Sequence, residues 1–167
     1  MKKKKSGGLM EFIPYVIVVI VVLMIKAFIV TPIRVNGPSM NDTLKNNDIM
    51  ILDEISYKFS GIERFDIVVI KNDDDFLIKR VIGLPGEEIE YKDNFLYVNG
   101  KKVKENFSHA KTEDIEKIKI PKNEYYVLGD NRVNSTDSRI IGTVSIDKFL
   151  GTTKFTIFPF NRFGSKE

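Results

Sequence analysis

The sequence predicts a mainly β protein with a single transmembrane helix at its N-terminus. Residues 12–30, FIPYVIVVIVVLMIKAFIV, contain one charged side chain, Lys26. From Thr31 onward the pattern changes to short β-branched and aromatic runs separated by glycine, asparagine and aspartate, which is typical of a β-rich domain. A chain of 167 residues has room for one ordinary core besides the apolar helix. We therefore expect one β-rich domain behind one apolar span.

The N-terminal apolar run is long enough to cross a bilayer. As a helix it would rise roughly 28 Å, and Lys26 near its end could reach the headgroups. A buried helix of a soluble protein is one alternative. A cleavable signal peptide is another, but no small-x-small site follows the run in KAFIVTPIRV. The run therefore predicts a retained membrane anchor.

Charge on either side of this run predicts the orientation of the chain. Lys2, Lys3, Lys4 and Lys5 precede the run, and the positive-inside rule then places the N-terminus in the cytoplasm. The predicted organisation is a cytoplasmic basic tail (1–10), a transmembrane helix (11–30) and an extracytoplasmic β domain (31–167).

Eight segments of the β domain resemble strands: IRV, DIMIL, DIVVI, FLIKRVIG, EIEY, FLYVNG, EYYVLG and KFTIF. VVIKNDDDFLIKRVI predicts a hairpin with its tip at Asn72–Asp75, and FLYVNGKKV predicts another that turns at Asn99-Gly100. The aspartates of the first tip have no spaced partner ligand, which favours a solvated turn over a metal site. Residues 91–120 are expected to be a variable excursion from the core, because their second half is polar and lysine-rich.

Composition excludes several classes of chemistry. The chain has no cysteine, which rules out disulfides, thiolate nucleophiles and Cys-ligated metal sites. The net charge is only +3, and much of it comes from the lysines of the basic tail, so nucleic-acid binding has little support. The single histidine, His109, has polar neighbours in ENFSHAKTED and is expected on a solvated loop. We expect no metal and no other cofactor.

Ser39, in NGPSM, is a candidate nucleophile that would need a base other than histidine. In the strand FLIKRVIG, successive side chains alternate between faces, so whichever face is buried holds a cation, Lys79 or Arg80. Burial lowers the pKa of a lysine, and the neutral amine can then accept a proton. Arginine stays protonated in proteins. An edge strand whose lysine reaches solvent is the alternative; if this strand holds a base, it is Lys79.

A third polar segment, GDNRVNSTDSR (129–139), lies between EYYVL and IIGTVSI, which both resemble apolar strands. Asp137 and Arg139 are two residues apart in what is expected to be an extended segment, so they would share a side and could pair. A hydroxyl such as that of Ser135 or Ser138 could orient the lysine amine, as a third group orients the base in other triads.

Four segments in this order carry a resemblance to a known family: GPSMNDTL (37–44), FDIVVI (65–70), IKRVIGLPGE (78–87) and GDNRVNSTDSR (129–139). Behind one apolar span they resemble bacterial type I signal peptidases of the short Gram-positive type. The resemblance implies a signal-peptidase-like β fold at the cell membrane. It also implies a serine endopeptidase that removes N-terminal signal peptides from exported preproteins after a small-x-small motif. Its partners would be those preproteins and the lipid bilayer.

The resemblance also implies a role for each matching residue. Ser39 would be the nucleophile and Lys79 the general base. Ser135 would orient the lysine. The remaining matches are the charged pair that braces the site, Asp137 and Arg139, and the start of the same segment, Asp130 and Arg132.

Two positions depart from the family pattern. Gly37 stands where the Gram-negative branch has a serine, which implies an oxyanion hole made mostly of backbone N–H groups, including that of Ser39. Asp42 stands where a proline is usual, which affects the turn after the nucleophile but removes no catalytic group.

Rival functions make different demands on the sequence. A membrane-anchored β module that binds a partner and catalyses nothing would need neither Ser39 nor Lys79. A self-cleaving repressor protease would need a DNA-binding helical domain, which residues 1–30 do not supply. A Ser-His-Asp hydrolase would have to use His109, and a sortase-like enzyme would need cysteine.

Overall fold

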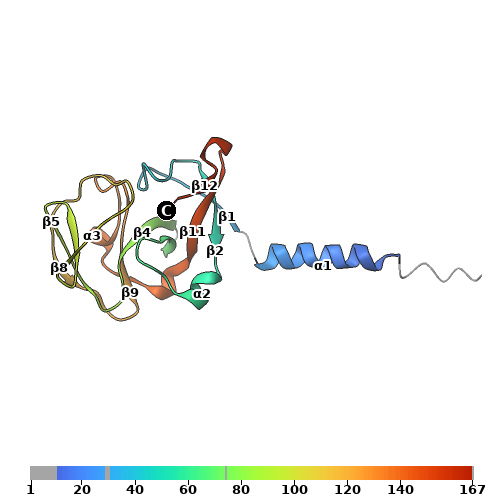
Figure 1. Ribbon diagram of the computed structural model, residues 1–167, viewed down its shortest axis with the longest axis horizontal. Coiled ribbons are helices and arrows are strands. Elements are labelled where there is room, and N and C mark those ends of the chain that lie inside the picture. Colours follow the sequence, from blue (N-terminus) through green and yellow to red (C-terminus); the bar gives the residue numbers. More distant parts are fainter. Residues whose placement is uncertain (1–10, 29–30, 74, 167) are drawn as a thin grey trace, which may run out of the picture. The chain divides into compact units, whose positions relative to one another are not determined.

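The computed structural model describes residues 11–28, 31–73 and 75–166 (Figure 1), and the chain divides into two compact units, Met1–Val30 and Thr31–Glu167. The basic tail predicted for residues 1–10, the last two residues of the predicted span, and Asp74 of the predicted hairpin tip lie outside the described residues. In the first unit, helix α1 comprises Ile13–Phe28. Among the described residues, no helix has the length and hydropathy of a membrane span.

The described part of the second unit is built on two antiparallel sheets (Figure 1). The larger sheet has the order β1-β2-β11-β3-β4-β9-β10, with β12 beside β11, and the smaller has the order β7-β6-β5-β8. The strands of the larger sheet are β1 (Thr31–Arg34), β2 (Ile49–Asp53), β3 (Ile67–Asn72), β4 (Asp75–Gly83), β9 (Glu124–Leu128), β10 (Val144–Ser145), β11 (Phe149–Phe158) and β12 (Gly164–Ser165). Those of the smaller sheet are β5 (Glu88–Lys92), β6 (Phe95–Val98), β7 (Lys101–Val103) and β8 (Ile115–Lys119). Four short helical segments connect them: α2 (Ser56–Ser60), α3 (Ser138–Ile141), η1 (Ile146–Lys148) and η2 (Phe160–Arg162).

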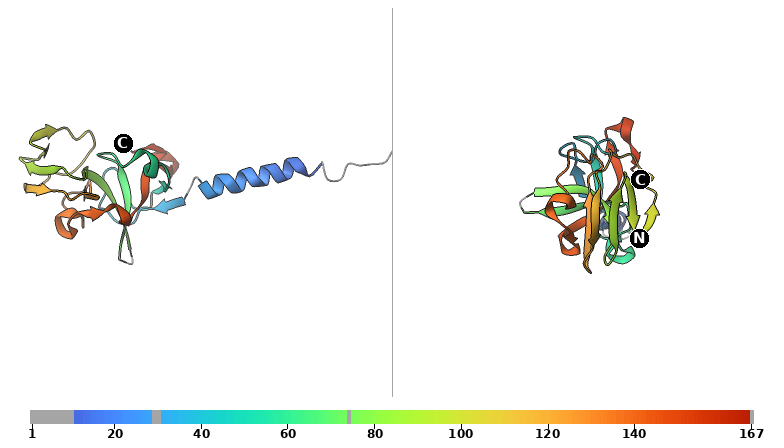
Figure 2. Two further views of the ribbon diagram at one scale, coloured as in Figure 1. Left: turned by 90° about the horizontal axis from the view of Figure 1, so that it is seen from below. Right: turned by 90° about the vertical axis from the view of Figure 1, so that its left-hand side faces the viewer.

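Both predicted hairpins are confirmed. Strands β3 and β4 pair as far as Asn72 and Asp75, and this hairpin projects from the rest of the unit in both views of Figure 2. Strands β6 and β7 are joined at Asn99 and Gly100, whose φ angles are 50° and 76°. Positive φ at both central residues defines the type I′ turn, whose twist matches that of the strands it connects.

The segment predicted as an excursion, residues 91–120, contributes three strands to the smaller sheet and much of a hydrophobic core. Ile89 pairs with Val98 and Tyr91 with Leu96 across β5 and β6, and all four side chains are buried in one cluster. Strand β8 adds Ile118 beside Ile89. In IEKIK the two isoleucines are three positions apart rather than alternating with polar residues, and the pairing with β5 is irregular there, which is why the pattern alone did not predict this strand.

Strand β4 is buried on both faces over its second half. Lys79 is 2% exposed and Arg80 is 1% exposed. Val81 packs in a cluster with Val68 and Val127, whereas Ile82 packs in the cluster of the smaller sheet. The expectation of a cation embedded among aliphatic side chains is therefore met on each face.

Two strand predictions near the C-terminus were wrong in extent. KFTIF is only the second half of β11, which begins at Phe149 because Gly151, Thr152 and Thr153 also pair or pack in the sheet. IIGTVSI is not one strand. Helix α3 occupies its start, ending at Gly142 with a φ of 77°, and only Val144–Ser145 forms a strand, β10.

Candidate active site

Ser39 lies in the loop between β1 and β2, which turns sharply on either side of it. Gly37 has a φ of 94°, a left-handed conformation that favours glycine, and its N–H donates to Asn46 Oδ1 over 3.0 Å. Beyond the serine, the Asn41 N–H donates to the Pro38 carbonyl over 3.0 Å, and buried Met40 anchors the turn. The turn after Ser39 therefore forms although Asp42 stands where the family that the sequence resembles usually has a proline.

Lys79 reaches this loop from strand β4. Its Nζ donates hydrogen bonds to Ser39 Oγ over 2.9 Å and to the carbonyl oxygen of Ile78 over 3.0 Å. The two side chains that the sequence singled out as nucleophile and base are thus in direct contact.

The surroundings of Lys79 favour its neutral form. Burial lowers the pKa of Lys79 to about 8, although the negative charges of Asp137 and Asp130 act in the opposite direction. An amine with this pKa is neutral in roughly a tenth of the molecules at pH 7, whereas an ordinary lysine is almost entirely protonated. Strand β4 itself contributes no carboxylate next to Lys79; the two that oppose its deprotonation come from the segment 129–139.

Asp137 and Arg139 pair as predicted, but in a different backbone setting. Arg139 Nε and Nη2 donate to the two carboxylate oxygens of Asp137 over 2.8 and 2.7 Å. The segment is not extended there, because Asp137 is the N-cap of α3 and Arg139 lies in the helix. The Gly129 N–H also donates to Asp137 over 3.0 Å. Burial would raise the pKa of Asp137, but these hydrogen bonds hold it below its usual value.

Ser135 lies beside the nucleophile loop but forms no hydrogen bond with Lys79. A Cβ added at Gly129 would clash with both Ser135 Oγ and the carbonyl oxygen of Ser39, so all three groups are close together. The buried Ser135 hydroxyl has no well-formed hydrogen bond to any described residue, although it lies near enough to Asp137 to help lower the pKa of that carboxyl. In this structure Lys79 is oriented by Ser39 and by the Ile78 carbonyl.

Asp130 and Arg132 point to different parts of the domain. Asp130, fully buried, accepts two hydrogen bonds from the Arg80 guanidinium over 2.9 and 2.8 Å and one from the Thr43 hydroxyl over 2.5 Å. Arg132 is directed toward the smaller sheet, where it donates to Glu105 over 2.7 Å. Asp130 therefore connects the site to β4, and Arg132 connects it to residues 105–112.

His109 lies on a loop between exposed residues such as Ser108 and Lys111, as expected, but its own side chain is mostly shielded from solvent, which corrects the expectation for the side chain. Its side chain is 13% exposed, its Nε2 lies 3.4 Å from Glu105, and its ring packs against that of Phe107. Its Nδ1 lies 2.8 Å from the Ala110 carbonyl. The described contacts of His109 are all within its own segment, and none of them is with Ser39.

An apolar cleft of about 460 Å³ runs beside Ser39 and Lys79. Two strands with free edges contribute to its walls. β1 ends the order of the larger sheet. Among the described strands, residues Asp75–Lys79 of β4 pair with β3 alone, because the pairing with β9 begins at Arg80. The other lining residues include Ile33, Val35, Leu52, Val69 and Leu150. Unpaired strand edges beside an apolar cleft suit an extended peptide that adds as a strand.

Sequence reasoning missed three groups that the fold brings to this site. Arg80 was considered only as a rejected base, but it binds Asp130 at the centre of the domain. The N–H of Asn131 donates to the Ser39 carbonyl over 3.0 Å. Glu105 holds Arg132. The first two lie in segments that the resemblance already marked, whereas nothing in the local sequence around Glu105 pointed to the site.

Comparison with known proteins finds a family and several relatives that this chain resembles. A family described as "Signal peptidase, peptidase S26" matches residues 9–158. Signal peptidase I S of Bacillus subtilis is 40% identical over 175 residues, covering 95% of this chain and 93% of that protein. Signal peptidase IB of Staphylococcus aureus is 40% identical over 178 residues, covering 93% and 92% of the two chains.

A solved structure is also similar. The crystal structure of a signal peptidase I from Enterococcus faecalis aligns with a TM-score of 0.50 and 33% identity over 55% of this chain and 95% of that one. The extent of these matches, together with the fold described above, shows that this chain belongs to the signal peptidase family, peptidase S26.

Proposed function

We propose that this chain is a signal peptidase I that removes N-terminal signal peptides from exported preproteins, with Ser39 as the nucleophile and Lys79 as the general base. The observation that carries the proposal is the 2.9 Å contact between Lys79 Nζ and Ser39 Oγ beside a peptide-sized apolar cleft. The names and extent of the relatives support the reaction, and the geometry supports the residues.

The contact is suited to acyl transfer. Neutral Lys79 accepts the hydroxyl proton as Ser39 Oγ attacks the carbonyl carbon of the scissile bond. The resulting ammonium gives that proton to the leaving amine, which departs as the N-terminus of the mature protein. Water, deprotonated by Lys79, then attacks the ester between Ser39 and the signal peptide, which releases a carboxylate and restores the serine. The sequence of steps requires water but no metal or other cofactor.

A backbone donor is available for the oxyanion. Within the described residues, the Ser39 N–H has no hydrogen-bond acceptor, while its own carbonyl is fixed by Asn131. A free N–H next to the attacking oxygen is the arrangement that stabilises a tetrahedral oxyanion. We assign this role to the Ser39 N–H, because Gly37 has no side-chain hydroxyl to offer.

The remaining residues of the site act as supports in this proposal. The Asp137–Arg139 pair fixes the backbone at Gly129, and Asp130 ties Thr43 of the nucleophile loop to Arg80 of β4. By the family resemblance Ser135 would hydrogen-bond the lysine amine, and its hydroxyl lies close to Gly129 beside the Ser39 carbonyl. Arg132 braces residues 129–132 through its hydrogen bond to the Gly129 carbonyl.

The substrate would bind as an added strand along the free edges of β1 and β4. Its side chains would alternate between the cleft and solvent. The family resemblance predicts small residues one and three positions before the cleaved bond. The apolar lining beside Ser39 is consistent with uncharged side chains there.

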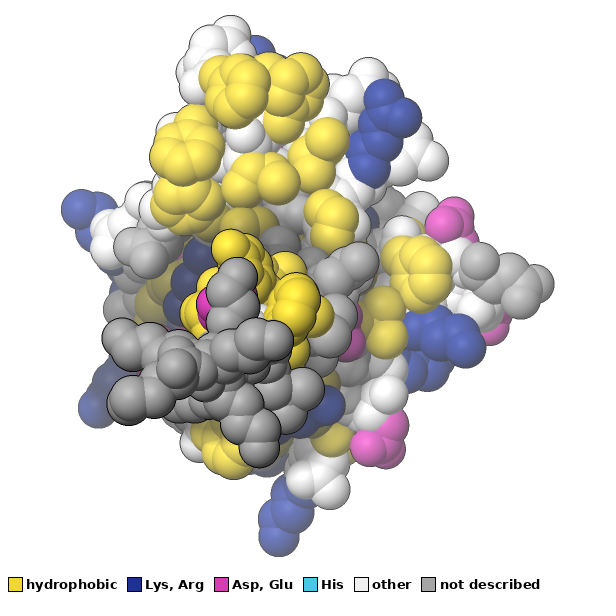
Figure 3. Space-filling view, turned by 90° about the vertical axis from the view of Figure 1, so that its right-hand side faces the viewer, with side chains coloured by type: hydrophobic (Ala, Val, Ile, Leu, Met, Phe, Trp, Pro, Cys, Tyr) yellow, Lys and Arg dark blue, Asp and Glu magenta, His cyan; other side chains and the backbone are white. Residues whose placement is uncertain are grey.

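The membrane placement rests on the sequence. Residues 1–10 would be a cytoplasmic basic tail, residues 11–30 a transmembrane helix, and residues 31–167 the extracytoplasmic catalytic domain, including the segment 91–120. A protease added outside intact cells should digest most of the chain and spare its first residues. Complete protection of the domain from the protease would show the opposite orientation, with the domain in the cytoplasm. Exposed phenylalanines at the C-terminal end, Phe158, Phe160 and Phe163, would suit proximity to lipid, and Figure 3 shows a group of hydrophobic side chains in the upper part of the face that it draws.

The decisive experiment is incubation of the full chain in detergent with a preprotein that carries an Ala-x-Ala site, followed by N-terminal sequencing of the product. We expect a new N-terminus immediately after the second alanine, and none when Ser39 or Lys79 is replaced by alanine. A membrane-anchored binding module would produce no cleavage in either case.

A further inference from the structure

Residues 129–132, which follow β9, hold the nucleophile loop in place. The Asn131 N–H donates to the Ser39 carbonyl over 3.0 Å, and its side-chain amide donates to the Pro38 carbonyl over 3.2 Å. The carboxylate of Asp130 accepts the Thr43 hydroxyl. The position of Ser39 relative to Lys79 therefore depends on where residues 129–132 lie.

The other side of residues 129–132 is held by a segment that the sequence suggested was only a polar excursion, residues 105–112. The Ala110 N–H donates to the Asp130 carbonyl over 3.0 Å. The Arg132 guanidinium forms an ion pair of 2.7 Å with Glu105, and both side chains are almost completely buried, at 1% and 5% exposure. Arg132 Nε donates back to the Gly129 carbonyl over 3.1 Å.

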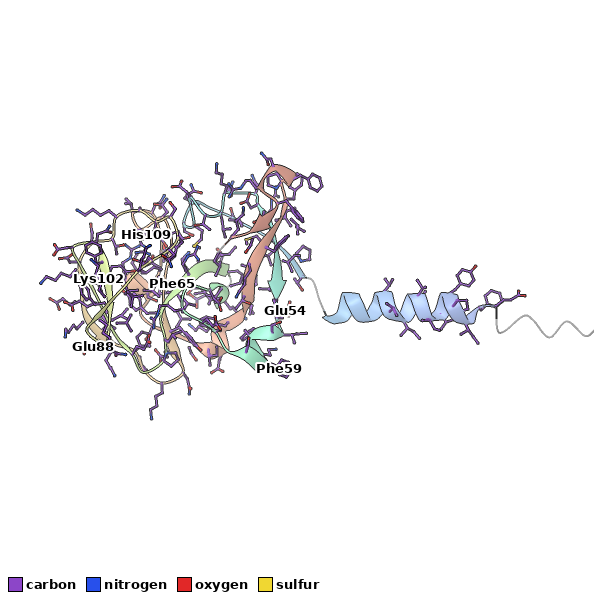
Figure 4. All side chains as sticks on the ribbon, viewed as in Figure 1. Glu54, Phe59, Phe65, Glu88, Lys102 and His109 are labelled. Carbon is purple, nitrogen blue, oxygen red and sulfur yellow. The ribbon has the colours of Figure 1, made fainter. Side chains whose placement is uncertain are left out.

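A second contact joins the same segment to Arg80. The ring of Phe107 lies over the Arg80 guanidinium, with 4.0 Å between the guanidinium carbon and the ring centroid. Arg80 in turn binds Asp130 through two hydrogen bonds. A guanidinium that is stacked and hydrogen-bonded in this way has little freedom to move. Figure 4 labels Phe65, whose ring packs against Phe107 and whose carbonyl accepts from Arg80.

We infer that residues 105–112 are a positioning element for the reaction, in which Glu105 and Phe107 fix residues 129–132 and thereby hold Ser39 in line with Lys79. Glu105 acts through Arg132, and Phe107 acts through Arg80. The inference rests on the proposed role of Ser39 as nucleophile. Neither side chain lines the cleft beside Ser39 and Lys79, so both are positioning residues.

This arrangement predicts a specific kinetic effect. Removal of the Glu105 charge leaves the buried Arg132 cation with neutral acceptors but without its carboxylate partner, and a buried uncompensated charge destabilises the arrangement around it. A shift of residues 129–132 by about 1 Å would misplace the nucleophile, and displacement on that scale can lower a rate about 100-fold. Apart from the loop that carries Ser39, the cleft that binds the peptide is built from β1, β2, β3, β4 and Leu150 of β11, so substrate affinity should change little.

The test compares Glu105→Gln and Phe107→Leu with Glu88→Gln in the full-length protein. Glu88 likewise forms an ion pair, with Lys117 of the smaller sheet, but the Glu88 side chain is 40% exposed and that of Lys117 is 60% exposed. Figure 4 labels Glu88. Cleavage of a preprotein peptide is measured at a temperature well below each unfolding midpoint, and kcat is expressed per folded molecule.

We expect Glu105→Gln and Phe107→Leu each to lower kcat at least fivefold with KM within twofold of the parent, and Glu88→Gln to change neither. Values of kcat within twofold of the parent in the variants that fold, or a loss confined to KM, would overturn the inference. If Glu105→Gln does not fold, Phe107→Leu decides alone, because it keeps every charge. Ser39→Ala in the same assay separates the two proposals: an active Ser39→Ala enzyme refutes the proposed function, whereas unaltered kcat in the Glu105 and Phe107 variants refutes only the positioning role.

Discussion

The side-chain nitrogen of Lys79 lies 2.9 Å from the hydroxyl oxygen of Ser39, although the two residues are 40 positions apart in the chain. Lys79 is almost fully buried, whereas Ser39 is partly exposed beside the cleft. An amine that is shielded from water and in contact with a reachable hydroxyl can act as a base at a pH where an ordinary lysine cannot.

The pH dependence of kcat/KM should report the titration of Lys79. Because the neutral amine is the active form and burial lowers the pKa of Lys79 to about 8, activity should be low in acid and rise tenfold per pH unit until it levels near that value.

Replacement of Lys79 by other basic residues should not preserve activity. Lys79→Arg keeps the charge but cannot become a base, so it should be as inactive as Lys79→Ala. Lys79→His should also be poor, because the histidine side chain is shorter than that of lysine and places its ring nitrogens away from Ser39. An active Lys79→Arg enzyme would exclude a lysine base.

Replacement of Ser39 by alanine should abolish cleavage and leave the fold intact. The substitution removes only the Oγ atom, which accepts a hydrogen bond from Lys79, and the turn around it is held by backbone contacts. Circular dichroism and the unfolding midpoint should match the parent within experimental error, while product formation falls to background. More than a trace of activity in a pure preparation would remove Ser39 from the mechanism.

Replacement of Lys79 by methionine should stabilise the protein near neutral pH while inactivating it. Lys79 has a pKa of about 8 in the folded chain and an ordinary value of 10.5, so below pH 8 the folded state bears the cost of a buried charge. Each pH unit of this difference corresponds to about 1.4 kcal/mol, which gives an expected gain of up to about 3 kcal/mol at pH 7. The gain should shrink as the pH rises from 8 toward 10.5, because the parent then loses its buried proton. Thermal unfolding in detergent measures the stability difference between Lys79→Met and the parent at pH 7 and at pH 10. A difference that is the same at both pH values would contradict this account.

Gly129→Ala should lower activity strongly, although it adds only one methyl group. A Cβ at this position would meet the Ser39 carbonyl oxygen and the Ser135 side chain, and overpacking of this kind costs about 1–3 kcal/mol. Since the Ser39 backbone carries the nucleophile, we expect kcat/KM to fall by about 100-fold or more. The measurement is kcat/KM alongside the unfolding midpoint. Full activity in a stable Gly129→Ala enzyme would show that the loop can move away without consequence.

Chelators and the His109→Ala substitution should leave catalysis nearly unchanged, because the proposed steps use only Ser39, Lys79 and water. His109 contacts Glu105 and Phe107, so a loss of up to threefold through the positioning element is compatible with the proposal. Assays with EDTA and with His109→Ala test this directly. Strong inhibition by EDTA would point to a metal role for the acidic residues near the hairpin tip or in the segment 129–139.

The sequence by itself determined the local features of this protein. Alternation in FLIKRVIG predicted the strand that carries Lys79 and a buried cation, and Asn99-Gly100 predicted a hairpin turn. These signals are local, because the period of a strand and the φ angles of a turn are set by neighbouring residues. The motif resemblance added the identity of the nucleophile and base, since short segments of matching sequence need no knowledge of their contacts.

Only the tertiary structure decided which distant groups meet. It placed Ser39 against Lys79, joined Arg80 to Asp130, and directed Arg132 to Glu105. It also turned Asp137 into a helix cap and buried most of His109, both against expectation. The physical reason is that burial and ion pairing depend on which strands pack together. The partner of Glu105 lies 27 residues away, and no local period specifies it.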